Sequence, residues 1–396
     1  MKNLRHRLGA ALSGLAVLLA AGACTGSSMT PEAPPGELTI GFVSPQTGPY
    51  EAIGTDMRNG WQLYLDQHGG KLGGHKVKVV MADEGDGTTA AQAAVDKLLK
   101  ADRAVAIVGT ATAPAVSTVA RPATEAKVPF VGVGGRPSTL ADVSYVWHTS
   151  FQSVDYGKAI GPHLAKNVKG PVYVIGPDYQ GGKDQIQGFV EAFTAAGGRL
   201  ANPDGKPAYT PWPATTNFGP WLAKIKDSGA AAVYTFYAGA PAVAFVKQYE
   251  QFVGSSTPLY AAGFLTEGAA LTAQGAAADS IFTGANYAPG LDNPYNKAFV
   301  GAFTAKNPGA VPNLYHVTSY DAAALLDKAI AAAGTNPTPE AINVAIGKLG
   351  QLDSPRGQWT FAPGTHTPVQ TWYLRQVKPE GAGRANVVVG ELGTIG

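Results

Sequence analysis

The residues of this 396-residue chain that can hold a ligand gather in short loops rich in glycine and hydroxyl side chains. Each loop follows an apolar run typical of a buried strand and precedes a helical pattern. In an open parallel sheet, ligands bind beyond the carboxyl ends of the strands, where helix N-termini present free N–H groups. We therefore predict a small-molecule site formed by four loops, Ser44–Tyr50, Gly109–Thr112, Gly132–Arg136 and Phe236–Gly239.

Arg136 adds a positive charge to the third of these loops, whose other residues are neutral and mostly glycine. Its planar guanidinium can bind a ligand carboxylate through two parallel hydrogen bonds. An ion pair between two domains would use the same group equally well, so the sequence leaves both roles open. Aromatic rings near the loops offer stacking surface, although each alone is more often a packing residue: Tyr50, Phe151, Tyr179, Tyr237 and Tyr287.

Motifs of the common enzyme classes are absent from the sequence. The segment Gly132–Pro137 begins like a dinucleotide-binding loop, but proline stands at the third glycine position. There is neither a Gly-Lys-Ser/Thr phosphate loop nor a Gly-x-Ser-x-Gly nucleophile elbow. The seven histidines are isolated, and Asp83, Glu84 and Asp86 lack calcium-loop spacing, so we expect these acids at a solvated loop end. We predict that the protein is no enzyme and uses neither metal nor cofactor.

Composition limits the class of protein and its partners. With 45% hydrophobic residues among 396, the chain can bury the cores of two domains. Its single cysteine, Cys24, excludes a disulfide scaffold and every multi-cysteine metal site. Of the 30 basic residues, Lys2, Arg5 and Arg7 lie in a removable leader, which leaves 27 against 28 acidic residues. No run of Lys and Arg remains to follow a phosphate backbone, so we expect no nucleic-acid partner.

The N-terminus predicts export. Residues 1–23 combine early basic residues, an apolar run too short to span a bilayer, and small residues, as a secretory signal does. The sequence Ala21–Cys24 resembles the bacterial lipoprotein cleavage box, in which the cysteine is acylated; an ordinary secreted protein with an incidental cysteine is the alternative. Residues 24–36 are polar and proline-rich and suit a flexible tether. We expect the protein in the periplasm or on the outer face of the cytoplasmic membrane, held there by lipid alone.

Strand and helix patterns alternate twice along the mature chain, which predicts an α/β fold with two doubly wound parallel sheets. The first series has strands at Leu38–Val43, Lys76–Met81, Val105–Val108 and Pro129–Val133. The second has strands at Val172–Ile175, Ala231–Phe236 and Pro258–Ala262. Three helices then precede three late strands, which we expect to be antiparallel additions to sheet edges: Gly357–Phe361, Thr371–Val377 and Asn386–Val389.

Motifs spread from Glu37 to Val377 resemble the branched-chain amino-acid-binding family of ABC-importer solute-binding proteins. They are Ile40–Pro49 with Gly54 and Asn59-Gly60, then Tyr320–Ala323, and finally Ser354–Gly357. The tail Thr367–Gln370 is most similar to members associated with amides and aromatic acids.

The resemblance implies a type I periplasmic-binding-protein fold, whose two lobes close on a ligand. It places three crossovers near Thr149–Ser150, Gly284–Tyr287 and Asp353–Gly357. Lobe 1 would comprise residues 37–149 and 287–354, and lobe 2 residues 150–286 and 355–396. The implied partners are a small-molecule ligand and ABC-importer permease subunits, and the protein would be a monomer. A sensor domain of the same fold is the alternative function, and a Rossmann-like enzyme is a less favoured one.

Three positions define the polar chemistry that the resemblance implies. Glu267 stands where the family carries an acid that pairs with a ligand ammonium, Ser153 where amino-acid binders have Asp, and Arg136 where they have Thr or Ser. One acid lost and one cation gained make an aromatic carboxylate, a dicarboxylate or an amide as good a candidate as an amino acid. Arg136 and Glu267 would then form the polar poles of the cleft. The predicted ligand-binding set is Tyr50, Thr110, Thr112, Gly134, Gly135, Arg136, Phe151, Tyr179, Tyr237 and Glu267.

Overall fold

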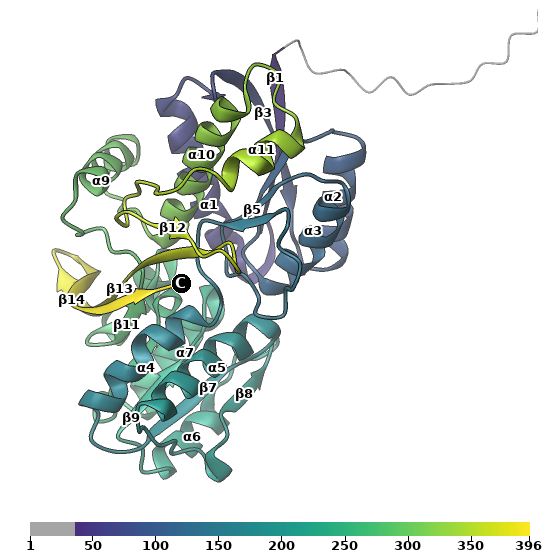
Figure 1. Cartoon of the computed structure of the whole chain (residues 1–396). Coiled ribbons are helices and arrows are strands. Elements are labelled where there is room, and N and C mark those ends of the chain that lie inside the picture. The colour runs from purple at the N-terminus through teal and green to yellow at the C-terminus, as the bar shows by residue number, and fades with distance from the viewer. Residues whose placement is uncertain (1–35) are drawn as a thin grey trace, which may run out of the picture. The chain divides into compact units, whose positions relative to one another are not determined.

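A computed structural model describes residues 36–396 as helices, strands and loops arranged around two β-sheets (Figure 1). The predicted signal segment, Cys24 and almost all of the predicted tether lie outside the described residues, so those predictions remain predictions. Among the described helices, none is both long and apolar enough to cross a membrane.

The first sheet has the strand order β2-β3-β1-β4-β5-β6, parallel except for the short β2. Its central strand β1 buries its last six residues, because helices cover both faces of the sheet. The strands are β1 (Glu37–Ser44), β2 (Lys71–Leu72), β3 (His75–Asp83), β4 (Ala106–Gly109), β5 (Phe130–Gly132) and β6 (Val146–His148). The helices between them are α1 (Glu51–Gln67), α2 (Thr89–Lys100) and α3 (Ala113–Glu125).

The second sheet has the order β12-β13-β11-β10-β9-β7-β8, with β14 paired to β13. Its parallel strands are β7 (Val172–Asp178), β8 (Ala208–Pro211), β9 (Ala232–Thr235), β10 (Leu259–Ala262) and β11 (Phe282–Ala285). The late strands β12 (Thr360–Phe361), β13 (Pro368–Glu380) and β14 (Gly383–Ile395) are antiparallel additions, as expected. Its helices are α4 (Asp155–Asn167), α5 (Gln180–Ala195), α6 (Gly219–Asp227), α7 (Gly239–Phe252) and α8 (Ala269–Gln274).

The chain returns to the first sheet after β11 and leaves it again before β12. The returning helices are α9 (Pro294–Lys306), α10 (Leu314–Ala333) and α11 (Pro339–Ile346), of which α10 packs along α1 and α11 packs on α10. Helix α10 begins at Leu314, because the Asn313 side chain caps it and accepts the N–H groups of Tyr315 and His316. We call the first sheet with α1–α3, α10 and α11 the first lobe, and the second sheet with α4–α8 the second lobe.

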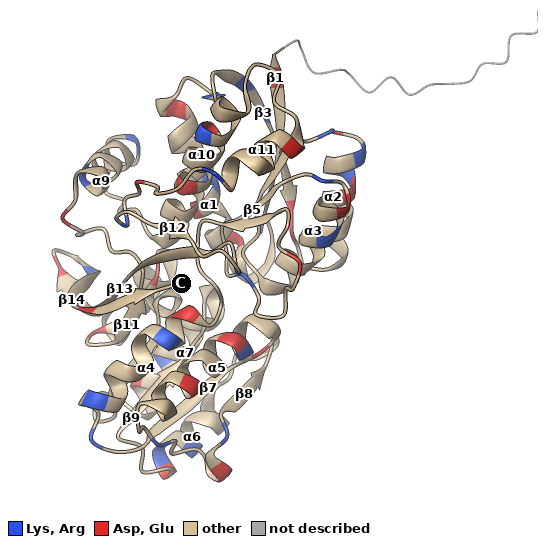
Figure 2. Cartoon of the chain, in the orientation of Figure 1, with Lys and Arg blue, Asp and Glu red and all other residues tan. Residues whose placement is uncertain are grey.

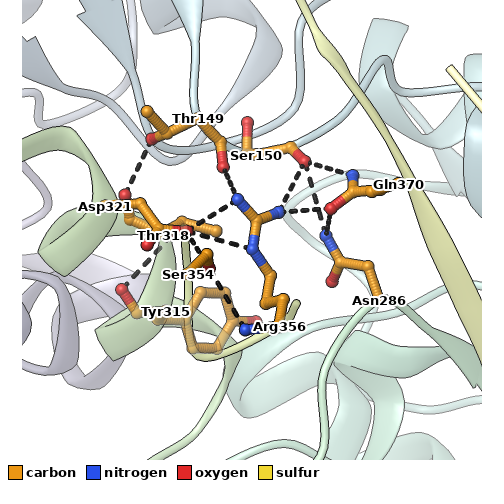
Figure 3. A network of polar contacts seen from close by, with 9 residues as sticks. All are labelled: Thr149, Ser150, Asn286, Tyr315, Thr318, Asp321, Ser354, Arg356 and Gln370. Atoms are coloured by element: carbon orange, nitrogen blue, oxygen red, sulfur yellow. Dashed lines mark hydrogen bonds and ion pairs between the residues drawn. The ribbon is translucent and has the colours of Figure 1, made fainter. Parts of the chain in front are cut away.

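The passages between the lobes meet at the guanidinium of Arg356 (Figure 3). It donates hydrogen bonds to the carbonyl of Thr149 at 2.6 Å and to the Asp321 carboxylate at 2.7 Å. It also donates to the Ser150 carbonyl and to Gln370 on β13, which in turn accepts from Asn286 at 3.0 Å. One buried polar network thus joins residues next to β6, β11 and β12 with a side chain of α10.

Charged residues lie mainly on the outer surface. Figure 2 shows both signs side by side on outer helices such as α2 and α6.

Candidate ligand-binding site

A cavity lies where the carboxyl ends of the strands of both sheets face each other. Residues that follow β1, β4 and β5 line one side, and residues that follow β7, β9 and β10 line the other. The start of α10 and the segment after β6 complete the wall. This is the edge of the sheets at which the four sequence loops predicted a small-molecule site.

Six aromatic rings dominate the lining. Within the second lobe, the Phe236 and Phe264 rings meet edge to face with centroids 5.5 Å apart. The Phe264 ring also lies 5.4 Å from that of Phe151 and 6.0 Å from that of Tyr315. Flat rings on both sides of a narrow space favour a planar, largely apolar ligand. The six are Tyr50, Phe151, Tyr179, Phe236, Phe264 and Tyr315.

The lining residues that the structure describes include no Asp, Glu, Lys or Arg. The polar groups among them are the side chains of Ser153 and Gln185 and the tyrosine hydroxyls. Burial raises the pKa of Tyr50 and of Tyr315 above the usual value, so both hydroxyls stay neutral. A ligand in this cavity would meet neutral donors and acceptors but no formal counter-charge.

Two helix N-termini reach the lining and make it more favourable for negative charge. Ala113 is the first residue of α3, and Gly181 is the second residue of α5. The first N–H groups of a helix have no partner within the helix, although in α3 Pro114 has no N–H and that of Ala115 donates to Thr112. The aligned peptide dipoles place a partial positive charge at each N-terminus. Because α3 belongs to the first lobe and α5 to the second, this partial charge comes from both sides.

Two of the lining residues also take part in a contact between the lobes. Trp212, just after β8, donates from Nε1 to the Tyr50 hydroxyl at 3.2 Å and stacks on Tyr179, with centroids 4.6 Å apart. Nearby, Gly239 has φ +58°, and a Cβ there would lie 2.5 Å from the Pro49 carbonyl oxygen. Only glycine allows this left-handed backbone to approach the neighbouring loop so closely.

Half of the predicted ligand-binding residues line the cavity: Tyr50, Gly134, Gly135, Phe151 and Tyr179.

The other predicted residues have their side chains elsewhere. Thr110 is fully buried, and Thr112 caps α3 by accepting the N–H of Ala115 at 3.4 Å. The Tyr237 hydroxyl lies 3.0 Å from that of Thr210, within the second lobe. Arg136 and Glu267, the predicted poles of the cleft, are absent from the cavity lining that the structure describes.

The terminal nitrogens of the Arg136 guanidinium bond within its own loop, while its buried Nε has no partner among the described residues. The guanidinium donates to the main-chain carbonyls of Pro137 and Leu140, and no ion pair between described residues includes it. In this arrangement the guanidinium neither lines the cavity nor forms an interdomain ion pair, so the carboxylate clamp stays a prediction. The backbone of Arg136 contributes instead, since its N–H donates to Phe151 and its carbonyl accepts from Ser153. These bonds hold two cavity residues in place.

The carboxylate of Glu267 is also engaged by protein groups. One oxygen accepts from Arg375 at 2.8 Å, and the other accepts the backbone N–H of Leu314 at 2.9 Å. The side chain is buried and does not reach the lining, so the structure does not support its predicted role as an ammonium acceptor.

Sequence reasoning missed several residues that form the site. Phe236 stood in one of the four predicted loops, but nothing in the sequence indicated that Phe264 and Tyr315 would face it. The prediction that Glu84 lies at a solvated loop end is wrong, because the side chain is fully buried. It accepts the N–H groups of Ala111 at 2.7 Å and Thr112 at 3.2 Å, and burial raises its pKa to about 7. Glu84 thereby fixes the loop that carries Ala111 into the lining.

Comparisons with known proteins agree with the resemblance seen in the sequence. A family model described as periplasmic binding protein matches residues 37–383. The Leu/Ile/Val-binding protein homolog 6 of Brucella melitensis is 30% identical over 346 residues, which cover 85% of this chain and 87% of that protein.

Solved structures of solute-binding proteins match over nearly the whole chain. One from an ABC transporter of R. palustris, in complex with benzoate, is 29% identical with a TM-score of 0.82 and covers 91% of this chain and 98% of that one. Another, from Rhodopseudomonas palustris BisB5 with 3,4-dihydroxybenzoic acid, is 26% identical with a TM-score of 0.83 and the same coverages. A leucine-binding protein from Thermotoga maritima, 21% identical with a TM-score of 0.79 and covering 88% of this chain and 97% of that one, shares the fold. The chain belongs to the periplasmic binding protein family, as a solute-binding protein of the ABC-transporter type and not an enzyme.

Proposed function

We propose that this protein binds a small aromatic carboxylate outside the cytoplasm and delivers it to an ABC importer. The observation that carries the proposal is the cavity lining, which combines six aromatic rings with no charged side chain among the described residues. The rings suit a planar body, and the N-termini of α3 and α5 favour a carboxylate at one end. Tyrosine hydroxyls, Ser153 and Gln185 offer hydrogen bonds to ring substituents.

A free α-amino acid fits this lining less well because its ammonium finds no carboxylate. Ser153 offers only a neutral hydroxyl, and both oxygens of Glu267 already accept hydrogen bonds from the protein. A charged ammonium buried without a partner is strongly disfavoured. The R. palustris proteins described above, crystallised with benzoate and with 3,4-dihydroxybenzoic acid, support the same ligand class.

An aliphatic amino acid is the second candidate. It is favoured by the name of the Brucella relative, a Leu/Ile/Val-binding protein homolog that is 30% identical to this chain. The two candidates differ in the ammonium and in the body of the ligand, aromatic or aliphatic, which makes them separable by direct binding.

The test is isothermal titration of the purified mature chain with benzoate, 4-hydroxybenzoate, 3,4-dihydroxybenzoate, leucine and phenylalanine. We expect one molecule of a benzoate to bind per chain and to be recovered unchanged, with leucine and phenylalanine much weaker. Phenylalanine is the informative control, because it keeps the ring and the carboxylate and adds the ammonium. Tighter binding of leucine than of any benzoate would transfer the proposal to the amino-acid class.

We further propose that a lipid on Cys24 anchors the protein at the outer face of the membrane, beside the permease subunits that it serves. The support is sequence alone: Cys24 is the only cysteine and follows Ala21-Gly22-Ala23 directly. Replacing Cys24 with Ser should move the protein from the membrane fraction to the soluble fraction. An unchanged distribution between the two fractions would refute the anchor without affecting the ligand assignment.

A further inference from the structure

We infer that Glu267 is a latch between the two lobes, held in position by Arg375 and closed by the N-terminus of α10. The latch consists of the Glu267 carboxylate, the Arg375 guanidinium and the backbone N–H of Leu314. All three are protein groups, so the inference goes beyond the proposed function and does not depend on which ligand the cavity takes.

Arg375 fixes the latch to the second lobe. It lies on β13, is completely buried, and donates to the Tyr287 carbonyl at 2.8 Å, the Gly263 carbonyl at 3.2 Å and the Thr283 hydroxyl at 3.2 Å. Its fourth bond runs to one oxygen of Glu267 at 2.8 Å. Because these partners follow or belong to strands of the second sheet, the Glu267 carboxylate has a defined direction before it meets the first lobe.

The other oxygen of Glu267 reaches the first lobe. It accepts the N–H of Leu314 at 2.9 Å, and Leu314 is the first residue of α10, which packs along α1. A carboxylate at this position satisfies one of the free N–H groups and interacts favourably with the positive end of a 20-residue helix. Arg375 and α10 therefore share one buried anion from opposite lobes.

A close backbone approach beside Glu267 supports the same contact. Gly268 has φ +57°, and a Cβ there would lie 2.5 Å from Asn313 Nδ2 and 2.8 Å from Asp56 Oδ2. Asn313 is the N-cap of α10 and donates to Asp56 of α1 at 2.6 Å. The Glu267-Gly268 segment of the second lobe thus lies directly against the helix cap of the first lobe. The lobes contact each other here through closely packed backbone as well as through the Glu267 carboxylate.

Lobe opening would break only one side of this arrangement. The bond from Arg375 to Glu267 remains within the second lobe, whereas the bond from Leu314 is lost. The latch therefore stabilises the closed arrangement, and apparent ligand affinity rises with the fraction of molecules that are closed. Glu267 and Arg375 act as positioning residues for closure, and neither needs to touch the ligand.

The first test is small-angle X-ray scattering of the mature chain without added ligand. Glu267→Gln removes the negative charge and places an amide against Arg375, so we expect a larger radius of gyration than in the parent. Asp279→Asn is the matched control, since Asp279 pairs with Arg384 at 2.9 Å on the surface of the second lobe only. It should leave the radius unchanged. Equal radii for the parent and Glu267→Gln would overturn the latch.

The second test measures release of 4-hydroxybenzoate by stopped flow and rests on the proposed function. Loss of one charge-assisted hydrogen bond should speed release from Glu267→Gln by about 10–100-fold. A merely structural role would lower the melting temperature and leave the release rate alone, and that result would also overturn the latch. If no benzoate binds, the proposed function fails while the scattering comparison still decides the latch.

A double variant covers the case in which Glu267→Gln does not fold. Glu267→Met combined with Arg375→Leu removes both charges together, and apolar replacement of a whole buried ion pair is often neutral for stability. The folded double variant should show the same larger radius of gyration. A compact double variant, identical to the parent in scattering, would overturn the latch.

Discussion

Ser153 presents a neutral hydroxyl to the cavity. It is buried in the lining beside Gly135, at a position where the sequence resemblance implies an Asp in amino-acid binders. We predict that Ser153→Asp weakens 4-hydroxybenzoate binding at least about 100-fold, because opposed like charges in an interface cost several kcal/mol. Isothermal titration of the variant checks this.

Ser153→Ala is the control for lost hydrogen bonding. It should weaken binding by about tenfold, the effect of one hydrogen bond of about 1.4 kcal/mol. Equal losses in the Asp and Ala variants would mean that charge at this position is irrelevant to ligand choice.

His148 predicts a pH dependence of folding stability. It is fully buried with Nδ1 3.0 Å from the Gly134 carbonyl oxygen, and burial lowers its pKa from 6.5 to about 3. A depressed pKa contributes stability that is present above pH 6.5 and is lost as the pH falls toward 3. At pH 4.5, two units below the unfolded value, the loss is about 2.7 kcal/mol.

The measurement is urea unfolding of the parent and His148→Gln at pH 7.5 and pH 4.5. Packing differences between the two proteins apply at both pH values, so only the change with pH is diagnostic. We expect acid to destabilise the parent more than the variant. Parallel losses in the two proteins would show that His148 does not titrate in this range.

The sequence indicated which loops carry the candidate residues, but not which groups their side chains contact. Arg136 and Glu267 do follow strands, as predicted. The groups that donate hydrogen bonds to Glu267, however, lie 47 and 108 residues away along the chain. A charged residue at a sheet edge can face the ligand, its own loop or another helix, and only the tertiary packing decides among them. The aromatic residues Tyr50, Phe151 and Tyr179 were easier to predict as lining residues, because a large ring at the edge of a cleft reaches the cleft in most side-chain orientations.

At the scale of elements, the strands with continuous apolar runs were the predictable ones. Strand β1 follows its run closely, and parallel order came from the alternation with helices. The short strands β2, β6, β8 and β11 were not predicted, because two to four residues carry little pattern by themselves. The equally short β4 and β5 were predicted because adjoining apolar residues lengthen their runs. The hairpin of β13 and β14 is longer than expected, since pairing continues beyond the apolar stretch into exposed residues such as Glu380.

Arg356 is expected to hold the passages between the lobes together. Its five donors serve Thr149, Ser150, Asp321 and Gln370, and an ammonium can neither span these acceptors nor match their planar layout (Figure 3). We predict that Arg356→Lys lowers the free energy of unfolding by about 3 kcal/mol, as partial loss of a buried pair does. Urea unfolding at neutral pH measures this.

The control for Arg356→Lys is Arg384→Lys, at an ion pair that is partly open to solvent. Arg384 donates to Asp279 at 2.9 Å, and exposed pairs contribute about 1 kcal/mol or less. The contrast between the two variants isolates the buried network from the mere exchange of Arg for Lys. Similar small losses in both would mean that the network adds little to stability.

At the scale of the whole molecule, the ligand site is shared between lobes that are separate α/β units. The lining takes Tyr50 and Val133 from the first lobe and Tyr179 and Phe236 from the second. The fold was therefore predictable from local patterns, while the site was only partly so, because it exists only where the two units meet. A ligand held on both sides couples their stabilities, as does the network around Arg356.

This coupling predicts the thermal behaviour of the mature chain. The lobes should unfold in a single calorimetric transition, since separating them breaks the Arg356 network and the Glu267 contact at once. Ligand at 100 times its dissociation constant stabilises the folded state by about 2.7 kcal/mol. With an unfolding entropy of about 2.1 cal/mol/K per residue, 4-hydroxybenzoate should raise the melting temperature by about 3–4 °C. Two transitions, of which the ligand moves only one, would show that the site belongs to one lobe and that the lobes are energetically independent.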